Sequence, residues 1–280
     1  MTFGEMDIRL LDDGTFKLDG GAMFGIVPKP LWEKITPPDE ANRIPLRTGV
    51  LLVRHQGGNI LVDTGMGTKL SPKLRSIYGL GPSLLLGALA EAGLTPDDID
   101  IVVFTHLHID HAGGATRLDD SGKATPAFPR AEHVIQTAEW QAAVNPNERT
   151  RGSYVPDDFV PLQDNGLVRL VDGDCDLTDG VKLVQTGGHT DGHQIVVLDS
   201  GGRKAAFLGD LIPTVSHLKL PYMMAYDLYP MDLVARKKAL IETALAENWL
   251  LIWQHDPNIE MGHLRRQGDD VLVEAGSSLD

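Results

Sequence analysis

The sequence predicts a mixed α/β (α+β) chain built around a substantial sheet core. Short apolar runs rich in Val, Ile and Leu end at turn residues along the whole length, which is typical of buried strands. Segments with helical spacing of apolar residues lie between these runs, as in a layered domain of sheets and helices. Because 280 residues can bury a full core, we expect one compact, loop-rich domain that spans residues 1–280.

Seven of the apolar runs are predicted to be strands. Each is short and bounded by turn residues, and each lacks the length of a helix. In chain order they are Gly49–Val53, Asn59–Val62, Asp100–Phe104, Val181–Val184, Gln194–Leu198, Lys204–Leu208 and Leu250–Trp253.

Three segments between the strands are predicted to be helices. Pro82–Ala92 is rich in Leu and Ala and is followed by a Gly, a typical C-terminal signal. Thr137–Val144 is shorter and begins at a Thr that can cap a helix. In Asp232–Asn248 the apolar side chains recur at the spacing that forms one helical face. Residues 145–165 and 211–230 are predicted to be loops, and loops beyond about 12 to 15 residues are often binding lids.

Composition and charge exclude several classes of function. The net charge of −14 would repel phosphate backbones and acidic membranes, and no run of Lys and Arg offsets it, so we expect no nucleic-acid partner. No segment approaches the roughly 20 apolar residues that span a bilayer, and the start, MTFGEMDIRL, lacks the parts of a signal peptide. We therefore expect a cytoplasmic protein with no membrane contact and a small-molecule substrate. The sequence neither requires nor excludes a homodimer.

The segment Ile101–Gly114 (IVVFTHLHIDHAGG) gathers polar side chains directly after a predicted buried strand. Its four potential metal ligands are His106, His108, Asp110 and His111. Open α/β sheets place their ligand sites beyond the carboxyl ends of strands, which is where this cluster falls. Core packing does not need imidazoles, which are costly to bury without partners, so the segment predicts a metal site.

Three later residues follow predicted strands in the same way. They are His189 in TGGHTDGH, Asp210 in FLGD and His255 in WQHDP. Each alone is a weak signal, but the repeated pattern of strand and ligand strengthens the prediction. Because four ligands so close in sequence cannot comfortably surround one ion, we expect two divalent metal ions per chain. Imidazole and carboxylate ligands suit Zn²⁺, and also Fe, Mn, Co or Ni.

The motif HLHIDH resembles the HxHxDH signature of the metallo-β-lactamase superfamily, and LVDTG, GGHTDGH, FLGD and QHDP resemble its other motifs in the family's order. The resemblance runs from about Val50 to His255 and implies a four-layer αββα sandwich with the site at one edge of its two sheets. By motif position it gives His106, His108 and His189 to the first metal and Asp110, His111 and His255 to the second, with Asp210 as a bridge. We interpret His193 as a supporting or core residue and Asp63, in VDTG, as a loop-organising carboxylate.

Differences from related patterns narrow the function that this resemblance implies. Flavodiiron oxidoreductases carry Glu where this chain has His108, and many true β-lactamases carry Cys where it has Asp210, so redox chemistry and antibiotic hydrolysis are disfavoured. Glyoxalase II enzymes have a basic C-terminal extension, which the short, mixed tail after His255 does not match. Nuclease members usually have an added domain or a basic exosite, which the net charge opposes.

The pattern that remains is most similar to that of the N-acyl homoserine lactone hydrolases (quorum-quenching lactonases) and their organophosphate-hydrolysing relatives. These share HxHxDH, the bridging Asp and the pair seen here at His255 and Asp256. The resemblance implies a hydroxide between two cations that attacks a lactone or ester carbonyl, with Asp110 as the catalytic residue that carries a proton to the leaving alkoxide. A phosphotriesterase or arylesterase is the alternative among enzymes, and a non-catalytic metal-bound binding protein is the alternative outside them.

The substrate-binding residues follow less directly from the sequence. The best-known lactonases place a Tyr three residues after the bridging Asp to polarise the carbonyl, whereas this chain has Pro213. His217, Tyr222 and Tyr226 in the following loop are candidates for that role. Candidates for an apolar acyl pocket are Met23, Phe24 and Trp32 near the N-terminus and Met223 and Met224 in the later loop. Core packing explains these apolar residues equally well.

Overall fold

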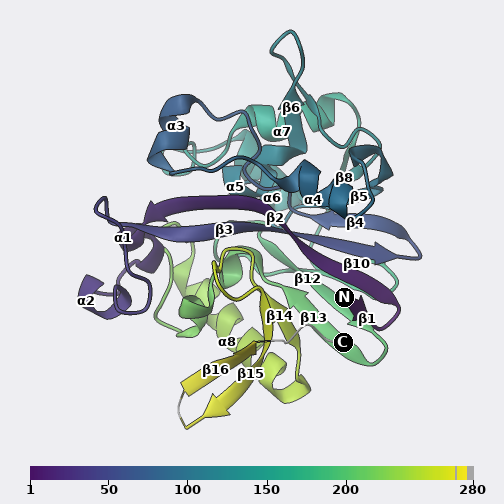
Figure 1. Ribbon diagram of the computed structural model, residues 1–280. Coiled ribbons are helices and arrows are strands. Elements are labelled where there is room, and N and C mark those ends of the chain that lie inside the picture. The colour runs from purple at the N-terminus through teal and green to yellow at the C-terminus, as the bar shows by residue number, and fades with distance from the viewer. Residues whose placement is uncertain (269, 276–280) are drawn as a thin grey trace.

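Two seven-stranded sheets pack face to face between two layers of helices in the computed structural model, which describes residues 1–268 and 270–275 (Figure 1). The first sheet has the spatial order β1 (Thr2–Phe3), β2 (Met6–Asp19), β3 (Arg43–His55), β4 (Gly58–Val62), β5 (Ile101–Val103), β8 (Glu132–Gln136) and β9 (Val168–Val171). The second has the order β10 (Cys175–Thr178), β11 (Val181–Gln185), β12 (Gln194–Ser200), β13 (Arg203–Phe207), β14 (Leu250–Ile252), β15 (Met261–Gln267) and β16 (Asp270–Ala275).

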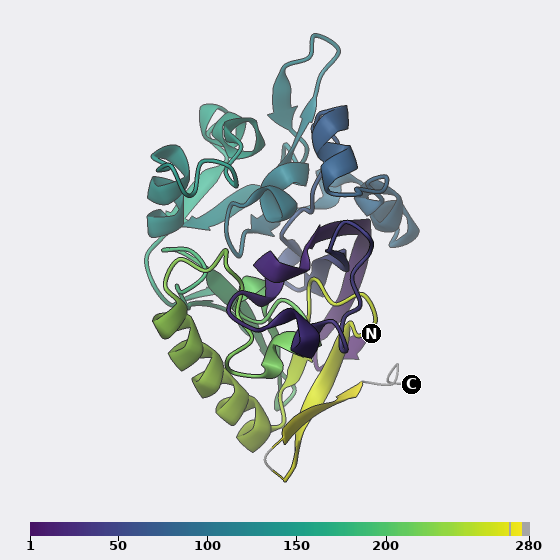
Figure 2. The same cartoon turned by 90° about the vertical axis from the view of Figure 1, so that its left-hand side faces the viewer.

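Helices cover the outer face of each sheet. The helices are α1 (Gly20–Phe24), α2 (Lys29–Trp32), α3 (Pro72–Ile77), α4 (Leu85–Glu91), α5 (Ile109–Ala112), α6 (Thr137–Val144), α7 (Pro156–Asp164) and α8 (Pro230–Glu247). Helices α3 to α7 lie above the first sheet in Figure 1, with the small hairpin β6 (Thr116–Leu118) and β7 (Ala124–Pro126), and α8 lies on the second sheet. Figure 2 looks at the molecule from the side of α1 and α2, which lie in front of the sheets there.

The core between the two sheets explains why the predicted strands are apolar throughout. In β4, Ile60 and Val62 face the second sheet, whereas Leu61 faces the helices above. In β13, Phe207 faces the first sheet and Ala206 packs toward α8. A strand that is buried on both faces must be apolar at every position, so it loses the alternation of a half-exposed strand. The predicted fold class is confirmed, with four layers in the order helix, sheet, sheet, helix.

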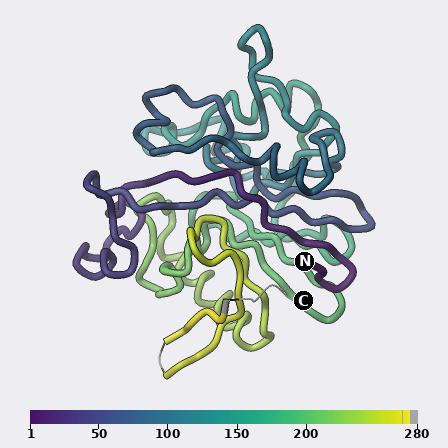
Figure 3. Tube along the Cα trace, viewed as in Figure 1, coloured from purple at the N-terminus to yellow at the C-terminus, as the bar shows by residue number. Residues whose placement is uncertain are grey.

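The long hairpin of β2 and β3 carries the first sheet beyond the shared core (Figure 3). Its register shifts between Asp12 and Thr15, where Gly14 has a φ of 108°, a conformation that favours glycine. A bulge of this kind bends and twists the strand. Beyond the bulge, Phe16 pairs with Leu46, and both pack in a separate apolar cluster with α1 and α2. The hairpin therefore supplies an apolar wall at one end of the molecule.

All seven predicted strands are present, as β3, β4, β5 and β11 to β14. The three predicted helices are also present: α6 has the predicted bounds, α4 is shorter than predicted, and α8 begins at Pro230. Residues 211–230 contain short 3₁₀ turns and otherwise run as a loop. No helix in the described part of the chain combines the length and the apolar character needed to cross a bilayer.

The prediction of one unbroken loop over residues 145–165 was wrong, because α7 occupies Pro156–Asp164. Pro161 inside the segment disfavours a helix, since it has no N–H for the carbonyl of Asp157 four residues earlier. The structure satisfies that carbonyl from elsewhere: the Thr116 hydroxyl donates to it at 2.6 Å. Phe159 is fully buried against the helix-facing side of the first sheet. Tertiary packing and a side-chain donor thus replace the missing helical hydrogen bond.

Candidate metal centre

The ligand segments all follow strands that end at the same edge of the two sheets. The segment with His106 to His111 follows β5, and His189 follows β11. Asp210 lies in a 3₁₀ turn after β13, and His255 follows β14. The glycines after His111 let the segment pack tightly, because a Cβ at Gly113 would collide with the carbonyl oxygen of Met66. Strands far apart in sequence thereby bring their polar ends to one place.

The structure gathers the seven predicted ligands into three overlapping groups, each with its ligand atoms within 4.8 Å of one another. The groups are His106, His108 and His189; His106, His111 and Asp210; and Asp110, His111 and His255. The nitrogen atoms approach closely: His189 Nε2 lies 3.1 Å from His108 Nδ1, and His255 Nε2 lies 3.3 Å from His111 Nε2. The first and third groups match the two metal sites that the motifs imply.

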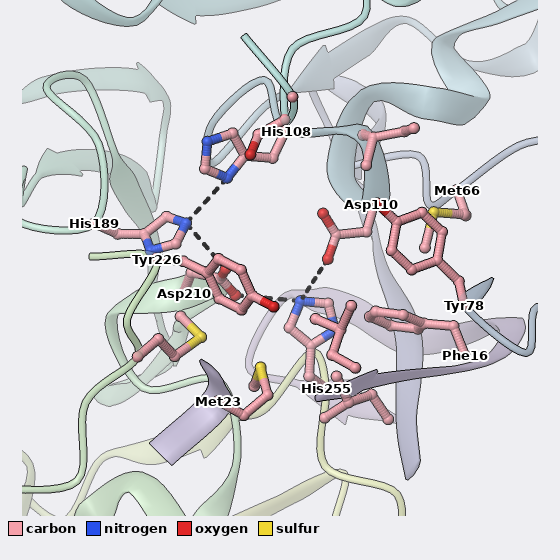
Figure 4. A pocket seen from close by; sticks show the side chains of 16 residues that line it. Phe16, Met23, Met66, Tyr78, His108, Asp110, His189, Asp210, Tyr226 and His255 are labelled. Carbon is pink, nitrogen blue, oxygen red and sulfur yellow. Dashed lines mark hydrogen bonds and ion pairs between the residues drawn. The ribbon is translucent and has the colours of Figure 1, made fainter. Parts of the chain in front are cut away.

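Asp210 lies between the two histidine groups and presents one oxygen to each (Figure 4). Its Oδ2 is 3.2 Å from His189 Nε2 and 3.9 Å from His106 Nε2. Its Oδ1 is 3.2 Å from His255 Nε2 and 3.7 Å from His111 Nε2. A carboxylate with this placement can contribute one oxygen to each of two ions.

The donor atoms fit divalent metal ions. The Nε2 atom of His106 and the Oδ1 atom of Asp210 are buried, and neither has a hydrogen-bond partner among the described residues. Burying polar atoms without partners costs free energy, and a metal ion would satisfy both. Imidazole nitrogens and carboxylate oxygens without thiolates suit Zn²⁺, Fe, Mn, Co or Ni.

The protonation of the cluster also suits a cation. Burial and the surrounding imidazoles hold the pKa values of His106 and His108 well below their usual range, so both rings are in the neutral form that binds metals. Burial also lowers the pKa of His111, but Asp110, Asp210 and Asp63 outweigh it and raise the pKa to about 10. These carboxylates create a negative potential that a metal ion can neutralise in place of a proton.

Hydrogen bonds to the outer nitrogens fix the orientation of the ligand rings. Nδ1 of His189 lies 2.8 Å from a carboxylate oxygen of Asp227, and Nδ1 of His255 lies 2.8 Å from the carbonyl oxygen of Arg47. Nδ1 of His111 lies 3.0 Å from Asp63, which also accepts from the backbone N–H of Thr105. A proton on each of these Nδ1 atoms leaves Nε2 free to face the centre.

His193, the second imidazole of the GHTDGH motif, supports the centre without joining the ligand groups. Its Nδ1 lies 2.6 Å from the Thr186 hydroxyl, and its Nε2 accepts a hydrogen bond from the backbone N–H of Asp210 at 3.0 Å. The ring is fully buried. It therefore holds the backbone of the residue that lies between the two groups.

A pocket opens onto the ligand cluster, and Figure 4 shows its lining. Met23, Met224 and Tyr226, all predicted from the sequence, line it, as do His108, Asp110, His189, Asp210 and His255. The other lining residues are Phe16, Leu18, Leu46, Met66, Tyr78, Ile109, Gly152 and Ser153. Most of these are apolar, so the pocket has a polar floor and an apolar wall.

Three of the predicted substrate residues lie behind the pocket wall, which corrects their expected role. Phe24 is fully buried and stacks between Trp32 and His217. Nε2 of His217 donates to the carbonyl oxygen of Met23 at 2.8 Å, its Nδ1 lies 2.7 Å from the Thr214 hydroxyl, and the ring is also buried. Tyr222 packs edge-on against Phe24. These side chains support the wall, and Met224 and Tyr226 are the candidates of the later loop that line the pocket.

Several residues of the site were not predicted from the sequence. Phe16, Tyr78 and Asp227 belong to segments with no ligand motif. Glu139, on α6, accepts hydrogen bonds beside the HxHxDH segment and is buried. The sequence shows only a Glu within a predicted helix, a position that is usually exposed, so it gives no signal for a buried Glu139.

Known proteins resemble this chain in sequence and in fold. The family model for the metallo-β-lactamase superfamily matches residues 44–255. An N-acyl homoserine lactonase from Bacillus sp is 29% identical over 165 residues, which are 53% of this chain and 57% of that protein. The chain thus spans little more than half the length of that relative. The N-acyl homoserine lactonase AttM of Rhizobium radiobacter is 26% identical over 222 residues, 74% of this chain and 81% of that protein.

Solved structures share the architecture over nearly the whole chain. A probable metal-dependent hydrolase from Staphylococcus aureus is 35% identical, with a TM-score of 0.89 over 99% of this chain and 100% of that chain. AidC, a dizinc quorum-quenching lactonase, has a TM-score of 0.83 at 20% identity over 100% and 97% of the two chains, which shows the fold alone. The family model covers most of the chain and includes all seven ligand positions. This chain therefore belongs to the metallo-β-lactamase superfamily.

Proposed function

We propose that this protein is a hydrolase that uses two divalent metal ions to open lactones, with N-acyl homoserine lactones as the substrate class. The observation that carries the proposal is the placement of two ligand groups, with Asp210 between them, at the floor of a pocket with an apolar wall. The names of the lactonase relatives support the substrate class. The similarity to the probable metal-dependent hydrolase of Staphylococcus aureus supports the reaction class.

The first ion would be held by His106, His108 and His189, and the second by Asp110, His111 and His255. Asp210 would serve both, with Zn²⁺ as the metal we expect. Two such ions, when bound, supply a nucleophile from water at neutral pH and stabilise the negative charge that develops on the substrate oxygen.

The pocket would orient an acylated lactone. The side chains of Phe16, Leu46 and Met23 form an apolar surface on which an acyl chain can bury its methylene groups. Tyr226 also lines the pocket and is drawn in front of Asp210 in Figure 4. Burial raises the pKa of Tyr226 to about 12, so its hydroxyl stays protonated and can donate a hydrogen bond to the substrate carbonyl. Tyr226 would thus provide the donor that Pro213 cannot.

Asp110 would move the proton. Its Oδ2 lies 3.7 Å from His111 Nε2 and 3.7 Å from His255 Nε2, and its side chain is 15% exposed into the pocket. It is therefore close to the centre and also accessible to the substrate. A carboxylate at this position can take a proton from the attacking water and pass it to the alkoxide that leaves as the ring opens.

A substrate panel tests the proposal. Metal-loaded protein is assayed with N-acyl homoserine lactones of increasing acyl length, an aryl ester, a paraoxon-like phosphotriester and a thioester, with chelator-treated protein as the control. We expect the highest kcat/KM for the lactones and a rise with acyl length, because the apolar wall binds methylene groups. A higher kcat/KM for the phosphotriester or the aryl ester would favour the alternative enzyme function. Binding of the substrates without turnover of any would indicate a binding protein.

A further inference from the structure

Glu139 is a buried carboxylate on α6, and its side chain is 1% exposed. None of the described ion pairs includes it. Its charge is stabilised by three hydrogen bonds instead. Oε1 accepts from the backbone N–H of Leu107 at 2.9 Å and from the Tyr154 hydroxyl at 3.0 Å, and Oε2 accepts from the Thr190 hydroxyl at 2.6 Å. Burying a carboxylate costs free energy unless it accepts several hydrogen bonds, so we expect Glu139 to have a specific role at this position.

Each of the three donors lies in, or packs against, a segment that carries a proposed metal ligand. Leu107 lies between His106 and His108 in the HxHxDH motif, and Thr190 directly follows His189. The ring of Tyr154 packs against His108, with ring centroids 5.0 Å apart. The three histidines that these contacts reach form one complete ligand group.

The backbone of α6 reinforces these contacts. A Cβ added at Gly192, in the segment after His189, would collide with the backbone nitrogen of Glu139. The GHTDGH segment therefore packs directly on the start of the helix, which only glycine permits at that position. The backbone of α6 thus packs against the segment after His189, and the Glu139 side chain binds both that segment and the HxHxDH segment.

The other ligand group is held by a different carboxylate. Asp63 accepts from the backbone N–H and the hydroxyl of Thr105 and lies 3.0 Å from His111 Nδ1. The hydrogen bonds described for Glu139 do not reach Asp110, His111 or His255. The Thr105 hydroxyl lies 3.2 Å from Nδ1 of both His106 and His111, so Asp63 supports both groups, whereas the hydrogen bonds of Glu139 reach only the first.

We propose that Glu139 is a positioning residue that sets the affinity of the first metal site, formed by His106, His108 and His189, and leaves the second site unaffected. This inference rests on the proposed two-metal site and is independent of the substrate. Glu139→Ala would leave three buried donors without an acceptor and free the two segments to move apart. Substitution of a residue that orients metal ligands typically weakens metal affinity by about 10 to 100-fold, so we expect the zinc affinity of the first site to fall by a factor in that range. Glu139→Gln keeps Oε1 as an acceptor for Leu107 and Tyr154, so its loss should be smaller.

The test isolates each site by removing a ligand of the other. Of the two proposed metal sites, His255→Ala leaves the three-residue set of the first complete, and His189→Ala leaves that of the second complete. The dissociation constant for Zn²⁺ is measured in both backgrounds by competition with a chromophoric chelator, with and without Glu139→Ala. We expect Glu139→Ala to raise the dissociation constant by about 10 to 100-fold in the His255→Ala background and to leave it unchanged in the His189→Ala background.

Asp13 provides the matched control. It is 3% exposed and accepts hydrogen bonds from the backbone N–H groups of Met66 and Leu85 and from the Ser83 hydroxyl, without touching a ligand segment. Asp13→Ala should lower the unfolding temperature and leave both zinc constants unchanged. Equal weakening of both sites by Glu139→Ala, or an effect that Asp13→Ala reproduces, would show a merely structural role and overturn the inference.

Two outcomes keep the inference distinct from the proposed function. If unsubstituted protein binds one zinc ion at saturation, the two-metal proposal fails. If it binds two and Glu139→Ala leaves the first constant unchanged, the inference about Glu139 fails. Should Glu139→Ala not fold, Glu139→Gln and Thr190→Val replace it, because each removes fewer contacts. Unchanged first-site constants in both of these variants would equally overturn the inference.

Discussion

Asp227 connects the wall of the pocket to His189, a proposed metal ligand, because one of its oxygens lies 2.8 Å from Nδ1 of that ring. Its other oxygen accepts from the backbone N–H of Met224 at 2.8 Å, and Met224 lines the pocket. The same carboxylate therefore sets the ring orientation of a ligand and the position of the loop that carries Tyr226. A displacement of this loop should therefore change the orientation of the His189 ring, and a rotation of the ring should displace the loop.

We expect Asp227→Ala to weaken zinc binding by about 10 to 100-fold, since His189 loses the acceptor that fixes its orientation. KM should also rise, because the pocket wall loses a backbone contact. Zinc affinity is measured by chelator competition, and KM at saturating zinc. Asp191→Ala is the control, because Asp191 is exposed and accepts from the Tyr229 hydroxyl of the same loop. Unchanged zinc affinity in Asp227→Ala would show that the contact does not orient His189.

Metal stoichiometry provides a second prediction. Seven proposed ligands, two groups of three with Asp210 between them, are too many for one tetrahedral ion, so protein saturated with zinc should contain two ions per chain. Chelation should lower the unfolding temperature, because ligands that bind the folded state at a thousand times their Kd stabilise it by about 4 kcal/mol. Elemental analysis and thermal unfolding with and without chelator measure both effects. Saturation at a single ion per chain would contradict the dinuclear site.

Tyr226 is expected to contribute its hydroxyl to catalysis. Tyr226→Phe keeps the ring in the pocket and removes the donor, so kcat for a lactone should fall by about 10² if the hydroxyl binds the developing oxyanion. Tyr222→Phe is the control, since Tyr222 packs against Phe24 outside the pocket lining. The measurement is kcat and KM for both variants at full metal content. Similar values in the two variants would remove Tyr226 from the mechanism.

The central strands and the ligand motifs could be predicted because both are local in sequence. Strands such as β13 are buried on both faces and stand out as continuous apolar runs. In contrast, β2 mixes buried Ile8 with exposed Asp7 and Arg9, so it forms no apolar run. The HxHxDH segment places four potential ligands within six residues after a strand, and no comparable pattern surrounds Asp227.

The pocket residues were harder to predict because tertiary packing brings them to the site. Tyr78 follows α3, far from every ligand motif, and reaches the pocket through the packing of that helix region. Met23 and Phe24 are neighbours in α1, where successive side chains point in directions about 100° apart. Only Met23 faces the pocket, and Phe24 is buried against Trp32. Apolar composition alone could not separate these two roles.

The last prediction separates metal binding from proton transfer at Asp110. Asp110→Asn keeps the shape of the side chain but removes its negative charge and its ability to carry a proton. An amide oxygen still coordinates metals weakly, so folding and the first site should persist while occupancy of the second site falls. We expect kcat for an aliphatic lactone to fall by about 10² to 10⁴, the range typical of a lost general acid.

The leaving group then decides the role of Asp110. A nitrophenolate leaves without much protonation, whereas the alkoxide of an opened lactone needs a proton, so the loss should be smaller for a nitrophenyl ester. The kcat of each substrate is measured for both proteins at zinc concentrations that fill both sites, with metal content determined in each sample. Equal losses on the two substrates at full occupancy would leave Asp110 as a metal ligand only, because a missing proton donor must penalise the poorer leaving group more.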